Sequence, residues 1–526
     1  MEGALSWIDL AVILIYFVFV LSVGWAVSRS ISTGDDLFLA GRSLGVAAVG
    51  FSLFASNISS TTLIGLTGQA YSTGLSVANY ELMAGFLLVA MAFSTIPVFL
   101  RLKMTTVPEY FERRFGGGLR KYVSVLTIFL TVFVDMAASV YAGVVVLRTF
   151  LPAIPFFPLS VGLAVIAGIY TAAGGLRAVV YTDIAQAIIL LLGATVLTFI
   201  LFGEFDYQWS NVIQSLPSGH LSLVRPLDDP ALPWLGLVIG VPVLGWFYWS
   251  MNQYVIQRVL AARNIETAQR AAIFAGLLKL APLFIMALPG AMALSLLPGL
   301  ENSDQVFSAL VAEFLPVGLA GLVIAGLIAA IMSTVDSTLN AATTLVLHDF
   351  LEVDRRSWSS ERILAVGRWT TGGLMVIATL WPLVIREFPG VFSYIQQVFS
   401  YAVPPVVAVS LLGLFWRRAR GRAMLATLIM GHAIGAGVFI YRASYAAMEI
   451  PDGLPHFTIV AGIATAVWMA VGLVLSEVMP TQAGESLEGV VRRTDLTVTA
   501  RLWFADVRIL GAVVAILTLL VIVVFR

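Results

Sequence analysis

Between residues 330 and 337 the chain places small and hydroxyl-bearing side chains at a spacing that suits the binding of a cation. Four of them recur at positions i, i+3, i+4 and i+7, which share one face of a helix: Ala330, Ser333, Thr334 and Ser337. Asp336 lies beside that stripe. Na⁺ is a hard cation that prefers carbonyl, hydroxyl and carboxylate oxygens, whereas Ser and Thr stripes also pack helices together in membranes. The stripe alone therefore predicts either an ion site or a packing face.

Two polar segments interrupt stretches that are otherwise apolar. The first, in the middle of the run 45–70, reads Ala55-Ser56-Asn57-Ile58-Ser59-Ser60-Thr61-Thr62. Ser and Asn compete with the backbone for hydrogen bonds and favour unwinding, and unwound backbone at membrane depth persists only against protein or a water-filled cavity. A second interruption follows at 245–254. Paired interrupted helices indicate a transporter's binding site, although small polar residues also serve as helix-packing contacts.

Five ionisable side chains fall within apolar runs: Glu81, Asp135, Asp183, Lys279 and Asp336. Each costs at least ~2.5 kcal/mol at the centre of a bilayer, so each needs a partner or a water-filled cavity. Four are acidic and one is basic, and a bound cation would supply the missing positive charge. For Asp135 we favour a structural hydrogen bond to a neighbouring helix.

The elements that position these groups must lie in a membrane. The chain has 526 residues, of which 59% are hydrophobic and 11% charged, whereas a soluble domain carries about 25% charged residues. This composition excludes soluble enzymes and disordered scaffolds. The formal net charge of zero gives no basic surface for nucleic acid, and the absence of cysteine excludes disulfides, thiolate metal sites and cysteine nucleophiles.

The apolar runs are too long for a barrel, whose strands span the membrane in about 10 residues, and they suit helices, which need about 20. We expect fourteen transmembrane helices, near 7–28, 45–70, 78–100, 121–147, 157–173, 179–203, 233–254, 271–297, 307–347, 363–385, 390–416, 423–441, 457–476 and 506–525. Lys and Arg gather in alternate loops. This bias predicts that both termini lie on the extracytoplasmic side. The gaps between the runs are ordinary loops, so we expect a single multi-pass domain, 1–526, in the cell (inner or plasma) membrane.

Several motifs together resemble the sodium–solute symporter family, and most closely its sodium/galactose and sodium/glucose cotransporter branch. They are Asn57-Ile58-Ser59, Asn79-Tyr80-Glu81, the segment from Gly174 to Asp183, the segment from Asn252 to Arg258, and Gly413-Leu414-Phe415-Trp416. The resemblance implies an all-α LeuT-type fold with two five-helix inverted repeats, 45–203 and 233–416, an extra N-terminal helix, 7–28, and extra C-terminal helices, 423–526. It implies a secondary active transporter, not an enzyme, that couples inward Na⁺ movement to uptake of a neutral sugar or polyol by alternating access.

The resemblance also implies where sodium binds. The principal site falls on the carbonyls of Ala55, Ile58 and Ala330 and the hydroxyls of Ser333 and Thr334. A second site, present in some members, falls on Asp183, Asp336 and Ser337. Here the carboxylate of Asp336 replaces a usual hydroxyl, so the number of sodium ions stays open.

For the sugar, the family's binding positions match Asn57, Glu81, Lys279 and Gln396. Tyr248 matches the aromatic gate on which the sugar ring stacks and Trp249 is its neighbour, while Leu66, Tyr80 and Phe392 match an outer hydrophobic lid. Three positions depart from the galactose pattern: Thr62, Gly245 and Ala84. The exact sugar is therefore open.

Other functions remain as alternatives. Within the transporters these are symport of myo-inositol, sialic acid or another solute, although Glu81 would repel a carboxylated substrate. A sodium-dependent sensor or channel on the same fold would need the same sites. A haem- or quinone-binding subunit needs histidines on facing spans, and of the four histidines only His432 lies well inside a predicted span. The expected partners are sodium ions, a small neutral solute and the lipid bilayer, without nucleic acid.

Overall fold

The computed structural model describes residues 6–28, 42–353, 356–388, 390–448, 453–481, 484–492 and 506–526. Within α1, α10 and α23 the side chains of residues 17, 20–21, 23–28, 166–184, 186 and 446–447 lie outside that description. The described chain is helical throughout, with two isolated bridges and no strand.

The first half of the chain forms the following helices: α1 (Trp7–Ser28), α3 (Val46–Asn57), α4 (Ser60–Thr73), η2 (Leu75–Ala78), α5 (Asn79–Phe93), α6 (Thr95–Arg101), α7 (Val107–Phe115), α8 (Gly117–Phe129), η3 (Leu130–Met136), α9 (Ala137–Phe150), α10 (Phe156–Gly203), α11 (Trp209–Ser215), α12 (Trp234–Ile239), α13 (Val241–Trp246) and η4 (Phe247–Met251). The second half forms α14 (Gln253–Leu260), α15 (Ile265–Leu278), η5 (Leu283–Ala287), α16 (Leu288–Leu296), η6 (Ser303–Gln305), α17 (Val306–Phe314), α18 (Leu319–Leu345), η7 (Val346–Phe350), α19 (Ser360–Leu380), α20 (Pro382–Ile385), α21 (Val391–Ala402), α22 (Pro404–Phe415), α23 (Gly421–Ala447), α24 (Phe457–Val478) and α25 (Val507–Val524).

Among the described residues, 9 helices are long and apolar enough to cross a membrane, or up to 11 if each of two bent pairs counts as one span. The expected count of fourteen is therefore not confirmed. One difference is that the runs predicted at 157–173 and 179–203 belong to a single helix, α10, of 48 residues. At 1.5 Å per residue this helix is about 72 Å long, more than twice the hydrocarbon thickness of a bilayer, ~30 Å.

Both predicted interruptions are breaks in the structure. α3 and α4 meet at an angle of 53° because the helix stops at Asn57 and restarts after Ser59, whose side chain caps α4 by accepting a hydrogen bond from the Thr62 amide. In the second, the π-helical η4 ends at Met251, and Asn252 has extended backbone with ψ 125° before α14 begins.

A third break is one that the apolar run 390–416 did not predict. α21 and α22 meet at 54°, and α22 begins at Pro404 and Pro405. Proline lacks the amide donor and disrupts the preceding helical turn. The two adjacent prolines explain the bend.

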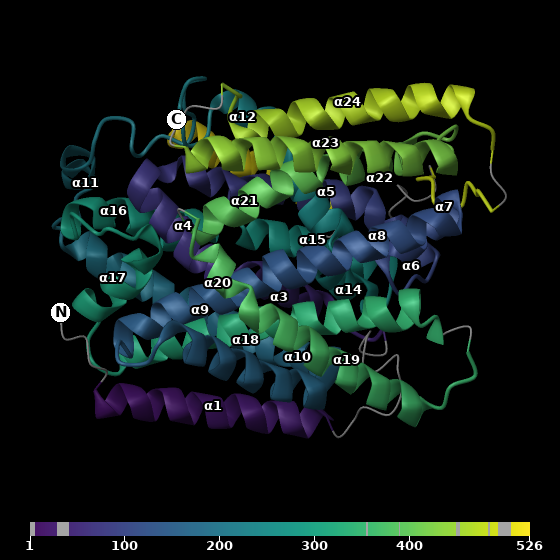
Figure 1. Cartoon of the computed structure of the whole chain (residues 1–526). Helices are drawn as coiled ribbons and strands as arrows, with labels where there is room; N and C mark the ends of the chain where they lie inside the picture. The colour runs from purple at the N-terminus through teal and green to yellow at the C-terminus, as the bar shows by residue number, and fades with distance from the viewer. Residues whose placement is uncertain are drawn as a thin grey trace.

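Helix α18 lies at the centre of the bundle, and nearly all of its side chains are buried. It packs against α10, α1, η3 and α19. In Figure 1 most long helices run roughly parallel across the view, with α1 at one edge and α23 and α24 at the other. The Asp9 carboxylate of α1 accepts hydrogen bonds from the amides of Gly318 (2.7 Å) and Gly321 (2.8 Å). It thereby satisfies donors at the N-terminus of α18 that have no partner within the helix.

Candidate functional site

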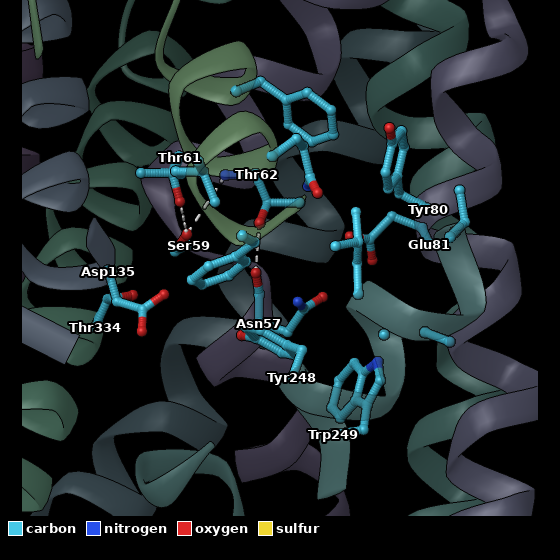
Figure 2. Close-up of a pocket in the computed structure, with 18 of the residues that line it drawn as sticks. Asn57, Ser59, Thr61, Thr62, Tyr80, Glu81, Asp135, Tyr248, Trp249 and Thr334 are labelled. Atoms are coloured by element: carbon cyan, nitrogen blue, oxygen red, sulfur yellow. Dashed lines mark hydrogen bonds between the residues drawn. The ribbon is translucent and has the colours of Figure 1, made fainter. Parts of the chain in front are cut away.

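The two halves of the chain enclose a polar and aromatic cavity beside the break between α3 and α4. It offers about 100 Å³ to water-sized molecules, enough for several waters or for a small polar solute that replaces them. Its walls come from the α3–α4 break, α4, α5, η3, α13, η4, α14, α18 and α21, and Figure 2 shows many of the side chains. The lining residues are Asn57, Ser59, Thr61, Thr62, Tyr80, Glu81, Ala84, Asp135, Val241, Leu244, Gly245, Tyr248, Trp249, Tyr254, Thr334, Phe392, Ile395, Gln396 and Phe399.

Of the residues predicted to surround the solute, Lys279 and the lid residue Leu66 do not line this cavity. The predicted residues that do line it are Asn57, Thr62, Tyr80, Glu81, Tyr248, Trp249, Phe392 and Gln396. The Lys279 ammonium instead lies behind the cavity wall, 2.5 Å from a carboxylate oxygen of Glu81, with its side chain fully buried. It also sits over the rings of Phe54 and Trp249, 5.5 and 5.3 Å from their centroids. Cation–π contacts of this kind stabilise a desolvated ammonium. Lys279 therefore neutralises and orients Glu81, which is the member of the pair that faces the cavity.

Two buried polar atoms of the wall lack a hydrogen-bond partner in the described structure: Asn57 Oδ1 and the Tyr80 hydroxyl. Most buried polar side-chain atoms in proteins are paired, so each exception needs an explanation. Other hydroxyls of the wall do have partners, since that of Thr62 donates to the Asn57 carbonyl (2.5 Å) and that of Tyr254 donates to the Tyr248 hydroxyl (2.7 Å). A ligand with hydroxyl groups would supply the missing partners.

Aromatic rings form the apolar part of the wall. Tyr80 and Phe392 meet edge to face with centroids 5.2 Å apart, and Tyr248 and Trp249 do so at 5.1 Å. Such edge-to-face pairs are a favourable arrangement for aromatic rings. The cavity therefore combines apolar ring surface with hydrogen-bonding groups, which matches the two surfaces of a sugar or cyclic polyol.

Asp135 lines the same cavity from the π-helical turn η3. It accepts a hydrogen bond of 3.2 Å from the side-chain amide of Asn252 at the second break, so the predicted bond to a neighbouring helix is present. The sequence did not predict that Asp135 also faces the cavity. A π-helix shifts the register of the side chains that follow it, and helical periodicity cannot foresee that shift.

A second, smaller cavity lies on the other side of the α3 terminus. It measures about 10 Å³ and is lined by Phe54, Ala55, Ile58, Ala187, Leu190 and Ala330, including all three predicted carbonyl ligands of sodium. This is roughly the space of one water-sized particle. The last carbonyls of a helix have no partner within it, so the end of α3 can present backbone oxygens here. The side chains that line the cavity are all apolar, so a hard cation here would have to be held by backbone oxygens.

The predicted hydroxyl ligands lie on α18 next to that cavity. Ser333 and Thr334 are buried, and the Thr334 hydroxyl donates to the Ala330 carbonyl (3.0 Å). Thr334 also lines the larger cavity, as Figure 2 shows. The α3 break and α18 therefore contribute to both cavities.

The predicted second sodium site has an unforeseen neighbour. The fully buried guanidinium of Arg258 donates to the Ser337 hydroxyl (2.5 Å), to the Ser52 hydroxyl (2.9 Å) and to the Tyr254 carbonyl (2.6 Å). Asp336 is fully buried on the same helix as Ser337. The side chain of Asp183 lies outside the described part of the structure, so its relation to these groups stays a prediction.

Comparison with known proteins agrees with this architecture. The family model described as the sodium:solute symporter family matches residues 37–431. The chain is 34% identical to the sodium/myo-inositol cotransporter 2 of Mus musculus over 85% of its own length and 72% of that protein. It is 35% identical to the sodium/glucose cotransporter 4 of Mus musculus over 84% of its own length and 70% of that protein.

Two solved structures share the fold. One is a Na⁺-coupled sialic acid symporter in a substrate-bound, outward-open state, with 24% identity and a TM-score of 0.75 over 90% of this chain and 99% of that one. The other is the nucleobase-cation-symport-1 transporter Mhp1, with 16% identity and a TM-score of 0.56 over 86% of this chain and 97% of that one. Because both sequence identities are below 25%, these two structures support the shared fold and say nothing about the solute of this chain.

Proposed function

This chain belongs to the sodium:solute symporter family, and we propose that its solute is a small neutral sugar or polyol. It is a Na⁺-coupled transporter with a LeuT-type fold, not an enzyme. The proposal concerns which solute it carries, which residues bind that solute and how the ion controls the binding.

The observation that carries the proposal is the pairing of two cavities across one helix break. Ala55 and Ile58 line the small cavity, and Asn57, between them in sequence, lines the large one. A cation held by the carbonyls of Ala55 and Ile58 would fix the conformation of the break. It would thereby fix Asn57 and, through the hydrogen bond to the Asn57 carbonyl, Thr62. An ion that binds one conformation better shifts the population toward it.

A neutral solute is supported by the charges of the large cavity. The negative charge of Glu81 is balanced by Lys279 at 2.5 Å, while Asp135 is bonded to the neutral amide of Asn252. A carboxylated solute would face an acidic group without a cation to receive it. Sugar or polyol chemistry is also what the names of the relatives indicate for those proteins.

Each cavity residue then has a proposed role. Asn57, Thr62, Glu81 and Gln396 bind hydroxyl groups of the solute, and Lys279 acts through Glu81. The Tyr248 ring covers the apolar face of the solute beside Trp249, and Tyr80 and Phe392 close the cavity from the opposite side. Sodium binds to Ala55, Ile58, Ala330, Ser333 and Thr334, and a second sodium ion to Asp183, Asp336 and Ser337.

Alternating access requires that the two halves of the chain move relative to each other around these sites. We propose inverted repeats at 45–203 and 233–416, with the broken segments α3–α4 and η4–α14 in corresponding positions. Both termini are proposed to be extracytoplasmic. Figure 1 is consistent with this orientation, because the start of α1 and the marked C-terminus lie toward one side of the view and α7, with Arg113 and Arg114 in its last turn, lies toward the other.

Uptake of labelled solutes into proteoliposomes tests the proposal. A panel of neutral hexoses, inositols, an amino sugar and sialic acid would be compared with an inward Na⁺ gradient and with a matching K⁺ gradient. We expect accumulation of a neutral sugar or polyol in the Na⁺ gradient alone. Accumulation of sialic acid without any neutral solute would contradict the proposal, and the absence of labelled counterflow for every solute would indicate a sensor.

A further inference from the structure

The bend between α21 and α22 leaves backbone carbonyls without their helical donors. Pro404 and Pro405 have no amide hydrogen, so they cannot donate to carbonyls four residues earlier as other helical residues do. The Ala402 carbonyl, at the end of α21, accepts a hydrogen bond of 2.8 Å from Nε2 of His432 on α23. The histidine side chain therefore binds the backbone of the hinge directly, beside the positions where the two prolines supply no amide donor.

The other ring nitrogen of His432 connects the hinge to a further helix. Nδ1 lies 3.0 Å from the Tyr122 hydroxyl of α8 and 2.7 Å from the Leu428 carbonyl one turn back in α23. Both carbonyls can only accept, and a neutral imidazole carries a single N–H. With that hydrogen on Nε2, the ring donates to the Ala402 carbonyl and Nδ1 accepts from the Tyr122 hydroxyl. The imidazole thus links α8, α23 and the hinge.

The backbone of α23 packs directly on the hinge beside this histidine. A Cβ atom added at Gly431 would collide with the ring of Pro405, and one added at Gly435 would collide with the Tyr401 carbonyl. Gly431, His432 and Gly435 lie at neighbouring positions of one helix face. α23 thus contacts the bend through two glycines and one hydrogen-bonding side chain, an arrangement that leaves little freedom for the bend to shift.

The hinge determines where α21 places its side chains in the large cavity. Phe392 and Gln396 both line that cavity, and Phe392 lies ten residues from Ala402, or about 15 Å along the helix axis. A rotation of about 5° at the hinge would move Phe392 by about 1 Å, and displacements of that size disturb bound ligands appreciably.

We propose that His432 is a positioning residue for solute binding, which holds the α21–α22 hinge so that Phe392 and Gln396 face the cavity correctly. The inference rests on the proposed function in one respect, since it takes the large cavity as the solute site. It assigns no contact between His432 and the solute.

Substitutions that keep or remove the Nε2 donor test the proposal. His432→Leu removes it, whereas the side-chain amide of His432→Gln can still donate to the Ala402 carbonyl. Without this donor the hinge loses a buried hydrogen bond that holds its position, so we expect His432→Leu to weaken solute binding about tenfold, which is about 1.4 kcal/mol. The affinity for Na⁺ in the absence of solute should change less than about twofold, and His432→Gln should recover most of the loss in solute affinity.

A matched control is Thr427→Val on the same helix, because the buried Thr427 hydroxyl donates to the Ala423 carbonyl of its own helix. This control should bind solute normally. If His432→Leu binds solute as tightly as the unmodified protein, or if it weakens solute and sodium binding equally without recovery in His432→Gln, His432 has no positioning role.

A second measurement does not depend on the identity of the solute. The chain contains no cysteine, so spin labels can be attached to single cysteines introduced at Ser393 of α21 and at the exposed Val125 of α8. We expect a narrow distance distribution in the protein with His432 or His432→Gln and a broader or shifted one in His432→Leu. An unchanged distribution in His432→Leu would overturn the proposal even if transport of every tested sugar failed.

Discussion

The Lys279 ammonium lies 2.5 Å from a Glu81 carboxylate oxygen, and of the two residues only Glu81 lines the cavity. The pair joins α5 to the C-terminal end of α15. Removing one partner of a buried pair leaves an uncompensated charge and costs more than removing both. Single and double substitutions of the pair therefore differ in their effect on stability, and this difference distinguishes a role in stability from a role in solute binding.

The first prediction concerns this pair. Glu81→Gln should weaken solute binding because hydrogen bonds to charged groups are worth about 1.5–3 kcal/mol, while Na⁺ still binds the solute-free protein. Lys279→Ala should destabilise the protein more than the double variant Glu81→Gln with Lys279→Met. Calorimetric solute titration and thermal unfolding measure the two effects. Normal solute affinity in Glu81→Gln would make the pair purely structural.

The second prediction concerns the hydroxyl ligands of the principal sodium site. Ser333→Ala removes one of about five ligands and should raise the Na⁺ concentration for half-maximal uptake, at a cost of about 1–3 kcal/mol. Thr338→Val is the matched control, since the Thr338 hydroxyl bonds to the Thr334 and Val335 carbonyls of its own helix. An unchanged Na⁺ dependence in well-folded Ser333→Ala would remove Ser333 from the site.

The third prediction concerns the second sodium ion. If Asp183, Asp336 and Ser337 hold it, Asp183→Asn should lower the Hill coefficient for Na⁺ toward one without abolishing solute binding. Asp336→Ser restores the hydroxyl usual in the family and should keep two-sodium coupling. Arg258, which donates to Ser337, would compete with a cation there. A Hill coefficient of one in the unmodified protein, together with a flux ratio of one Na⁺ per solute, would contradict the second sodium site. The Arg258 guanidinium would then be the cation beside Ser337.

The fourth prediction concerns pH and the other end of α21. Asp304, 2% exposed in the loop segment η6, accepts a hydrogen bond from the Val391 amide (3.1 Å) and one from the Tyr141 hydroxyl. Burial raises the pKa of Asp304 from 3.8 to about 6. Because the folded protein binds this proton more tightly than the unfolded chain does, protonation of Asp304 raises the free energy of unfolding. This contribution is complete below pH 4 and is lost as the pH rises through about 6.

Asp304→Asn should remove this pH dependence. The shift in pKa corresponds to about 3 kcal/mol of unfolding free energy between low and neutral pH. The difference in thermal stability between the unmodified protein and Asp304→Asn should therefore change between pH 4 and 7. Parallel stability curves for the two proteins over that range would show that Asp304 does not titrate there.

The sequence predicts the polar breaks better than it predicts the partners of buried charges. Ser, Asn and Thr in the run Ala55–Thr62 compete locally with helical hydrogen bonds, and this competition is readable without a structure. The bend at Pro404 and Pro405 carried an equally local signal, but uniform hydrophobicity around it favoured a single span.

The positions of the charged side chains depend on packing between distant segments. Lys279 and Glu81 are 198 residues apart in sequence, and the choice of which one faces the cavity depends on the rings of Phe54 and Trp249 around the ammonium. Arg258 was recognised as part of a motif, but its contact with Ser337 requires that α14 pack against α18. No periodicity in a single segment contains this information.

The most direct test of the account is the affinity for solute measured with and without sodium on the purified protein. If the α3–α4 break couples the two cavities, Na⁺ should tighten solute binding, and the solute should tighten Na⁺ binding by the same factor, because linkage between two sites is reciprocal. A coupling of about 1–3 kcal/mol corresponds to a factor of about 5 to 150. Equal solute affinity in saturating Na⁺ and in Na⁺-free buffer would contradict the account.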